Sequence, residues 1–134
     1  MTKFLSDKWL KECRRTLQDS QEFQAEAGNF CGDFIFTFEA DGELSKTKRL
    51  FLSIQGGACT DALFLNGEPL PEADYRISAP YSLWIKMIKG EEDAFSAFTT
   101  RKVKVRGNML RLMMNSGTAV ALVKALADMP VDFN

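Results

Sequence analysis

Apolar residues near the start of the chain recur at helical spacing. Ser6 is a favourable N-cap residue, and the segment after it carries one apolar stripe. The stripe consists of Trp9, Leu10, Cys13 and Leu17. The other positions are polar or charged, so the pattern predicts an amphipathic helix with one covered face. The segment 21–27 is expected to continue as helix until Gly28 and Asn29 stop it.

The apolar period changes to two after Asp33, which predicts β-strands. The aromatic residues of the first strand share one face, and they are Phe34, Phe36 and Phe38. A second strand has the inward row Leu50, Leu52 and Ile54. In a third strand, 58–65, Leu63 and Leu65 compete with Ala62 and Phe64, and the pattern leaves its inward face open.

The segment from Ala73 onward predicts another strand followed by a helix. Ile77 follows Tyr75 at strand spacing, Pro80 suits the first turn of a helix, and Gly90 is placed to end it. Three acidic residues at 91–93 favour the start of a further helix, because its dipole stabilises negative charge there.

The last part of the chain predicts one more strand and a helical pair. Three cationic residues alternate with valines in the period of a half-buried strand, and they are Lys102, Lys104 and Arg106. Gly107 and Asn108 then turn the chain into a helix at Met109. The C-terminal helical pair is expected to break near Gly117 and to end at Pro130.

Together these elements predict an α+β fold. Five strands form a mostly antiparallel sheet, and the helices pack on one of its faces. The length of 134 residues suits a single domain, 1–134, that buries roughly two-thirds of its unfolded surface.

Composition and charge exclude several classes of protein. Seventeen basic residues nearly balance eighteen acidic ones, so no global field favours nucleic acid. The chain has no His, and its cysteines, Cys13, Cys31 and Cys59, lack metal-ligand spacing, so no metal or cofactor is expected. The longest uncharged run, 112–123, is too short to span a bilayer. Unpaired thiols and the lack of an apolar leader predict a cytoplasmic protein.

Three stretches carry a resemblance to a known family: ADYRIS from Ala73, LWIKMIKGEEDAFSAF from Leu83 and KVKVRGNM from Lys102. Their order and punctuation resemble the sterol carrier protein 2 family of small lipid-transfer domains. The resemblance implies a domain that holds an acyl chain or sterol in an apolar cavity between sheet and helices, with no catalytic group. The family usually has Gly immediately before the basic strand, where this chain has Arg101. A left-handed backbone conformation would be costly for Arg at that position.

Large, soft side chains from both layers are the candidate lining of this cavity. They are Phe34, Phe36, Phe38, Leu52, Trp84, Met87, Ile88, Phe95, Phe98, Met109, Leu112, Met113 and Val120. Methionines, including Met114, adapt to irregular apolar shapes. Small residues at 117, 119, 121 and 125 predict a C-terminal helix whose short side chains cover the interior without filling the space between helix and sheet. The expected ligand is a long-chain fatty acid, a fatty acyl-CoA or a sterol-like lipid, and the apolar lining does not choose among them.

Two other classes of function stay open at this point. A small α+β enzyme could use a buried carboxylate, Asp33, Glu39 or Asp74, as general base, although without His the common nucleophilic machineries are unavailable. A structural interaction module would use the exposed face of the Trp9 helix.

The basic strand has two interpretations of its own. Its cations either attract an anionic head group in a transient membrane contact, or they only keep a sheet edge soluble. The strand has no interleaved exposed aromatic residues, which argues against binding of single-stranded nucleic acid.

Overall fold

The computed structural model describes residues 2–42, 44–65, 71–93, 96–97, 100–129 and 131–132. Its main sheet contains β2 (Gly32–Glu39), β3 (Lys48–Gln55), β4 (Ala58–Leu65), β5 (Tyr75–Pro80) and β6 (Lys104–Gly107). The helices are α1 (Asp7–Asp19), α2 (Gln21–Ala27), α3 (Tyr81–Ile88), α5 (Met109–Met114) and α6 (Ser116–Ala127). The short strands β1 (Thr2–Lys3) and β7 (Val131–Asp132) form a separate pair.

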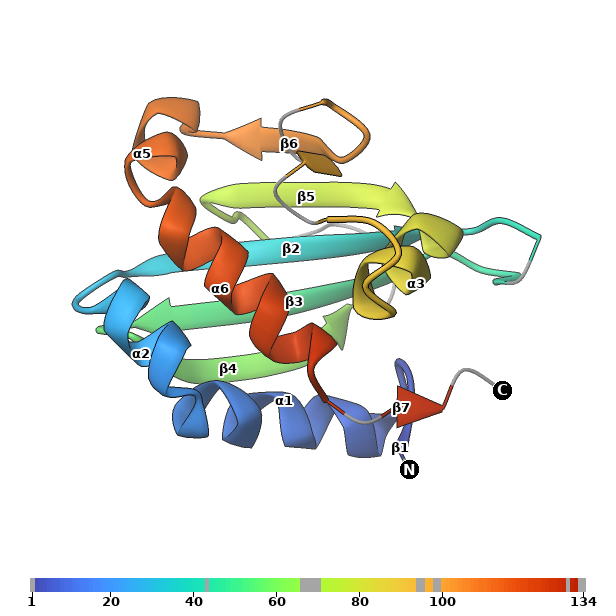
Figure 1. Ribbon diagram of the computed structural model, residues 1–134, viewed down its shortest axis with the longest axis horizontal. Coiled ribbons are helices and arrows are strands. Elements are labelled where there is room, and N and C mark those ends of the chain that lie inside the picture. Colours follow the sequence, from blue (N-terminus) through green and yellow to red (C-terminus); the bar gives the residue numbers. More distant parts are fainter. Residues whose placement is uncertain are drawn as a thin grey trace.

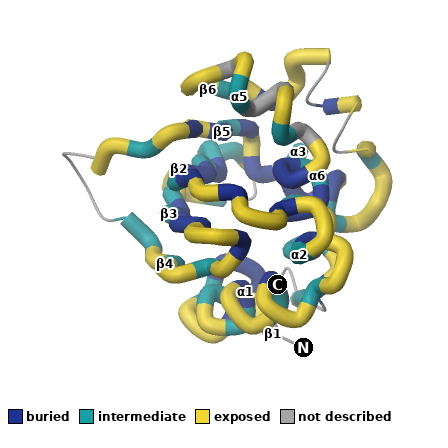
Figure 2. The backbone as a smooth tube through the Cα atoms, turned by 90° about the vertical axis from the view of Figure 1, so that its left-hand side faces the viewer, coloured by how far each residue is buried: buried dark blue, intermediate teal, exposed yellow. Residues whose placement is uncertain are grey.

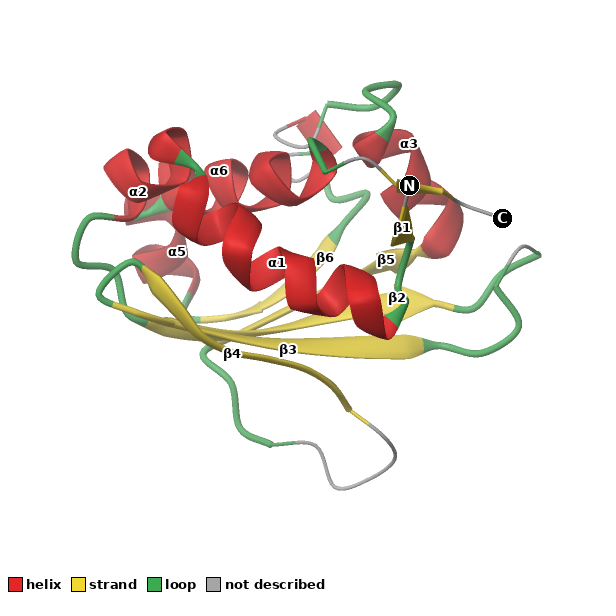
Figure 3. Ribbon diagram, turned by 90° about the horizontal axis from the view of Figure 1, so that it is seen from below, coloured by secondary structure: helices red, strands yellow, loops and turns green. Residues whose placement is uncertain are grey.

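The main sheet has the strand order β4-β3-β2-β5-β6, and its helices lie on one face (Figure 1). Figure 3 shows α1, α2, α3 and α6 on the same side of the strands, with α6 running across the sheet in Figure 1. The α+β class and the one-sided packing predicted from the sequence are confirmed. The sheet is mixed, because β2 pairs in parallel with β5 while the other three pairings are antiparallel.

The register aligns the apolar rows of neighbouring strands. Phe34 lies opposite Leu52 of β3 and Tyr75 of β5, and Phe36 lies opposite Leu50 and Ile77. Residues directly opposite each other point to the same face of a sheet. The phenylalanine row of β2 therefore continues on both sides, and all of these residues are buried.

The register also gives β4 its inward face, which the sequence left open. Ala62 pairs with Leu52 and Phe64 pairs with Leu50, so these two side chains face the helices. Leu63 pairs with Phe51 on the opposite face, where 41% of its surface is exposed. A shift in register between Ser53 and Ile54 marks an irregularity of this strand pair.

Two serines begin the first two helices. The hydroxyl of Ser6 accepts a hydrogen bond from the Trp9 amide at 3.2 Å, and the hydroxyl of Ser20 accepts one from Phe23 at 3.1 Å. The segment 21–27 is helical and stops at Gly28, as predicted. It is a separate helix, because Ser20 adopts an extended backbone conformation and caps the new helix.

The turn before β6 places Arg101 in the left-handed backbone conformation that is unfavourable for a residue with a Cβ. Arg101 has a φ of 64°, in the left-handed region. The backbone oxygen of Ala97 accepts hydrogen bonds from Lys102 at 3.0 Å and Val103 at 3.3 Å, which close the chain around Arg101. The turn geometry is therefore retained although the side chain is unsuited to it.

The two ends of the described chain meet beside α1, an arrangement that the sequence did not predict (Figure 1). β1 pairs in parallel with β7, with Thr2 opposite Val131. Phe4 and Leu5 follow β1 and are buried, at 5% and 3% exposure. The chain ends thus add two apolar side chains to the core.

The C-terminal helical pair breaks at Asn115, two residues before Gly117, and α6 ends at Ala127. Pro130, the predicted end, lies outside the described residues. α6 packs on α2, where the Thr118 hydroxyl donates to the Glu26 carbonyl at 2.9 Å. The carboxylate end of the exposed Glu26 side chain lies beside Gly117.

Candidate functional site

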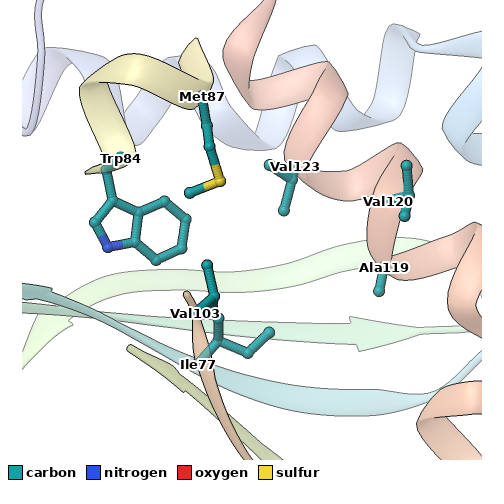
Figure 4. A pocket seen from close by; sticks show the side chains of 7 residues that line it. All are labelled: Ile77, Trp84, Met87, Val103, Ala119, Val120 and Val123. Atoms are coloured by element: carbon teal, nitrogen blue, oxygen red, sulfur yellow. The ribbon is translucent and has the colours of Figure 1, made fainter. Parts of the chain in front are cut away.

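Aromatic side chains fill much of the space between the sheet and α3. The Trp84 ring packs against Phe38 at 4.8 Å and against Phe36 at 6.0 Å between ring centroids. Its indole nitrogen donates to the backbone oxygens of Thr37 and Ala79, both at 3.1 Å. These bonds hold the indole against the sheet, and Figure 4 shows its ring between α3 and the strands, beside α6.

A first apolar cavity lies between Trp84 and α6. Its volume is about 20 Å³, and seven side chains line it (Figure 4). They are Ile77, Trp84, Met87, Val103, Ala119, Val120 and Val123. None of these residues is charged, so an aliphatic group is the chemistry that this space accepts.

A second apolar cavity lies toward α1 and the N-terminal segment. Its volume is about 30 Å³. It is lined by Phe4, Trp9, Phe36, Phe38, Leu50, Trp84, Ile88, Val123, Leu126 and Ala127. Trp84 and Val123 line both cavities, so these two side chains stand between them.

Each cavity has room for about one or two water molecules, whereas pockets for small ligands start at about 300 Å³. This conformation is therefore closed around its apolar interior. A long hydrocarbon chain fits only if α3 and α6 move away from the sheet or if Trp84 and Val123 change rotamer. Such movement at Trp84 breaks the hydrogen bonds that its indole nitrogen donates to the backbone oxygens of Thr37 and Ala79.

The predicted lining residues fall into three groups. Trp84, Met87 and Val120 line the first cavity, and Phe36, Phe38 and Ile88, again with Trp84, line the second. Phe34 and Leu52 are buried in the core but line neither cavity. Phe95 and Phe98, and the side chains of Met109, Leu112 and Met113, lie outside the described residues. Met114, which is not among the predicted lining residues, is 79% exposed.

Sequence reasoning missed several lining residues of the second cavity. Phe4 precedes the first predicted helix and belongs to no periodic pattern. The helical pattern places Trp9 on the covered face of its helix but does not assign it to the cavity. Leu126 and Ala127 lie at the end of α6, and only the pairing of the chain ends indicates what they face.

The carboxylates considered as general bases lie outside this interior. Asp33 accepts a hydrogen bond from the Ser53 hydroxyl at 2.6 Å, and Asp74 accepts one from the Asp33 amide at 2.8 Å. Asp33 and Glu39 are half-buried and Asp74 is exposed. None of the three is the buried base that the enzyme interpretation requires. The described residues also contain no group of three potential metal ligands.

Two polar atoms in the described interior lack a hydrogen-bond partner. They are the indole nitrogen of Trp9 and the hydroxyl of Tyr75. The Tyr75 side chain stacks near Phe30 and Phe34, and burial raises the pKa of its hydroxyl. Burial also raises the pKa of the Cys13 thiol on α1, so this thiol stays protonated. In the described part of the chain, helices are too short or too polar to cross a membrane.

Solved structures with this architecture include a sterol carrier protein 2 crystal structure. It matches with a TM-score of 0.84 and 23% identity, over 96% of this chain and 100% of that one. The solution structure of a conserved hypothetical protein from Thermus thermophilus, possibly a sterol carrier protein, matches with a TM-score of 0.81 and 22% identity, over 98% and 93%. At these identities the likeness defines the fold.

A family model matches much of the sequence itself. The chain belongs to the SCP-2 sterol transfer family, whose model covers residues 15–120. A search of the curated proteins found no match. Membership makes the chain a lipid-binding or lipid-transfer domain and confirms the resemblance seen in the sequence.

Proposed function

We propose that this protein is a non-enzymatic carrier of a long-chain lipid, held between the sheet and helices α3 and α6. The ligand is a fatty acid, a fatty acyl-CoA or a sterol-like lipid. The observation that carries the proposal is the pair of apolar cavities that share Trp84 and Val123 in their linings. Both cavities lie between the sheet and the helices, and a movement of these two side chains would join them.

The free energy gained by burying a lipid chain can drive the sheet and the helices apart. Each buried methylene contributes roughly 0.8 kcal/mol, so a long chain can offset the cost of displacing two helices and of association. A carrier needs no catalytic group, and none of the three candidate carboxylates is fully buried. We also place the carrier in the cytoplasm, because its three cysteines, Cys13, Cys31 and Cys59, are free thiols.

The experiment is a titration with a fluorescent long-chain fatty acid, joined to native mass spectrometry of lipid that co-purifies. A carrier binds the probe saturably at one molecule per chain and releases it unchanged. Absence of saturable binding at every chain length contradicts the proposal. Hydrolysis or isomerisation of a bound lipid would instead favour an enzyme.

We further propose that α5 and β6 form the surface that meets an anionic membrane during lipid exchange. Leu110 and Met114 lie one turn apart on α5 and are 72% and 79% exposed. Lys104 and Arg106 are exposed on the neighbouring strand. Figures 1 and 2 place α5 and β6 together at the edge of the molecule opposite α1.

Charge complementarity supports an anionic lipid surface as the partner. Cations near such a surface contribute about 1 kcal/mol each, and exposed apolar side chains insert among the head groups. Arg111 of the same helix instead contacts other residues of the protein surface, with its guanidinium 5.5 Å from the Phe30 ring centroid and 3.9 Å from Asp74.

A further inference from the structure

One lining residue of the second cavity comes from outside the regular elements. Phe4 lies between β1 and α1, whereas every other residue that lines this cavity belongs to a helix or to strand β2 or β3. Its ring packs at 5.1 Å from Trp9, 5.7 Å from Phe38 and 5.9 Å from Tyr81 between centroids. These rings come from α1, β2 and α3, and Phe4 is 5% exposed. A phenyl ring of the N-terminal segment, residues 2–5, therefore fills space between the two layers.

The backbone beside Phe4 is strained. Leu5 has a φ of 63°, in the left-handed region that is unfavourable for a residue with a Cβ. Its side chain is buried, so packing holds the residue in this conformation. Strained residues persist only where the surrounding structure fixes them, and they cluster at ligand sites and switch regions. The N-terminal segment is thus held in place against its own backbone preference.

Few polar contacts attach the N-terminal segment to the rest of the described chain. β1 contributes two residues to its pairing with β7. The Ser6 amide donates to the Lys3 carbonyl at 3.2 Å, and Lys48 donates to the Leu5 carbonyl at 3.3 Å. The pairing with β7 also restrains α6, because β7 follows this helix and the last two residues of α6 line the same cavity. Separation of β1 from β7 therefore releases Phe4 and the C-terminal end of α6 together.

We propose that Phe4 is an intramolecular plug, whose ring occupies the α1 end of the lipid path and leaves it when a hydrocarbon chain enters. The inference rests on the proposed carrier function and adds the step that opens the closed interior. The entering chain replaces the apolar contacts of the Phe4 ring with its three aromatic neighbours. Displacement also lets Leu5 leave its left-handed conformation and frees α6 to move away from the sheet.

A plug and a wall of the cavity differ in the sign of their effect on lipid affinity. Removal of a wall residue removes contacts with the ligand, so the affinity falls. Removal of a plug removes a closed state that competes with the ligand, so the apparent affinity rises. Phe4→Ala should therefore bind a fluorescent long-chain fatty acid about tenfold more tightly than the unmodified protein. Phe4→Leu, which keeps an aliphatic side chain to support folding, should change the affinity in the same direction.

Phe30→Ala is the matched control for a general loosening of the core. Phe30 is 7% exposed, also lies in a connecting segment and lines neither cavity. It packs against Phe34 of β2, whereas Phe4 packs against Phe38 near the other end of that strand. Phe30→Ala should therefore leave the affinity within about twofold of the unmodified protein. Equal gains in Phe4→Ala and Phe30→Ala would overturn the plug, because loosening alone would explain both.

Hydrogen exchange of the unmodified protein gives a second readout that does not depend on a variant. Saturation with palmitate should speed the exchange of the backbone amides of residues 3–6, because the displaced segment opens locally. The amides of the central strand β3 should keep their protection. Slower exchange at residues 3–6, or unchanged or weaker binding by Phe4→Ala, would overturn the plug and leave the carrier function standing. Absence of saturable binding in the unmodified protein and in all three variants would overturn the carrier function, and the plug with it.

Discussion

The indole nitrogen of Trp84 lies 3.1 Å from the backbone oxygen of Thr37, and this hydrogen bond ties α3 to the central strand β2. A residue that joins the helix layer to the sheet and also borders both cavities must respond when the layers separate. Trp84 is therefore the natural reporter of lipid entry.

We expect the emission of Trp84 to change in wavelength or intensity when lipid saturates the protein. Trp9→Phe isolates the signal, since the chain has two tryptophans. An unchanged spectrum at full occupancy, verified by a displaced fluorescent probe, would place the ligand elsewhere.

Val123 borders both cavities, so a substitution there tests whether this position lines a ligand cavity or belongs to a close-packed core. Val123→Leu adds one methylene where the structure has free volume, so its free energy of unfolding should change by less than about 1 kcal/mol. Affinity for long acyl chains should fall, because the added group occupies space that the ligand needs.

The matched control is Val105→Leu, at a half-buried valine of β6 that lines neither cavity. It should leave affinity unchanged. Equal affinity for lipid in Val123→Leu and the unmodified protein would show that the chain does not pass between Trp84 and Val123. Denaturant melts and lipid titrations on the same samples separate the two effects.

Much of the fold could be predicted because its signals are local. The alternation of Phe34, Phe36 and Phe38 predicts a strand and its inward face, and Ser6 predicts where α1 begins. Strand 58–65 gave no such answer, since apolar residues occupy both of its faces. Its facing follows from pairing with Leu50 and Leu52, which is information held in another segment.

The candidate site was harder to predict because it depends on long-range pairing. Phe4 and Leu126 meet at the second cavity, where the two ends of the chain come together. Neither residue has a local pattern that points to the other. Burial of Phe34 and exposure of Met114 show the same limit, because apolar character does not by itself distinguish core, cavity and surface.

Burial of Cys13 predicts a pH dependence of stability. The folded protein raises the pKa of this thiol far above the ordinary value of 9.0, so the unfolded state ionises first as pH rises. The buried, protonated thiol contributes fully to the free energy of unfolding below about pH 9, and this contribution is lost as the pH rises above that value. Each pH unit in that window removes up to about 1.4 kcal/mol from the free energy of unfolding.

Denaturant melts give the free energy of unfolding of Cys13→Ala and of the unmodified protein at pH values from 8 to about 10.5. The quantity compared is the slope of this free energy against pH. Cys13→Ala loses packing at all pH values but should lack this part of the slope. Cys31→Ala, which removes an exposed thiol, is the control and should keep the original slope. Identical slopes in all three proteins would contradict the prediction.

The proposed membrane surface is tested by removing its apolar residues. Leu110→Ser with Met114→Ser should leave stability nearly unchanged, since both side chains are more than 70% exposed. Sedimentation with vesicles of phosphatidylcholine and phosphatidylglycerol should decrease, and binding should weaken further at high salt. Leu63→Ser, at an exposed leucine on the opposite edge strand β4, is the matched control. Equal loss in that control would mean that α5 is not the contact.

Arg101 offers a test of backbone strain before the basic strand. Its φ of 64° is unfavourable for a residue with a Cβ and accessible to glycine. Arg101→Gly should raise the free energy of unfolding by up to about 1 kcal/mol, because the relief of strain exceeds the added entropy of the unfolded chain. Arg101→Ala separates strain from charge, since alanine removes the guanidinium but keeps the Cβ. It should therefore stay near the unmodified protein in urea melts. Equal stabilisation by both substitutions would mean that the guanidinium, rather than the left-handed backbone, is the unfavourable element.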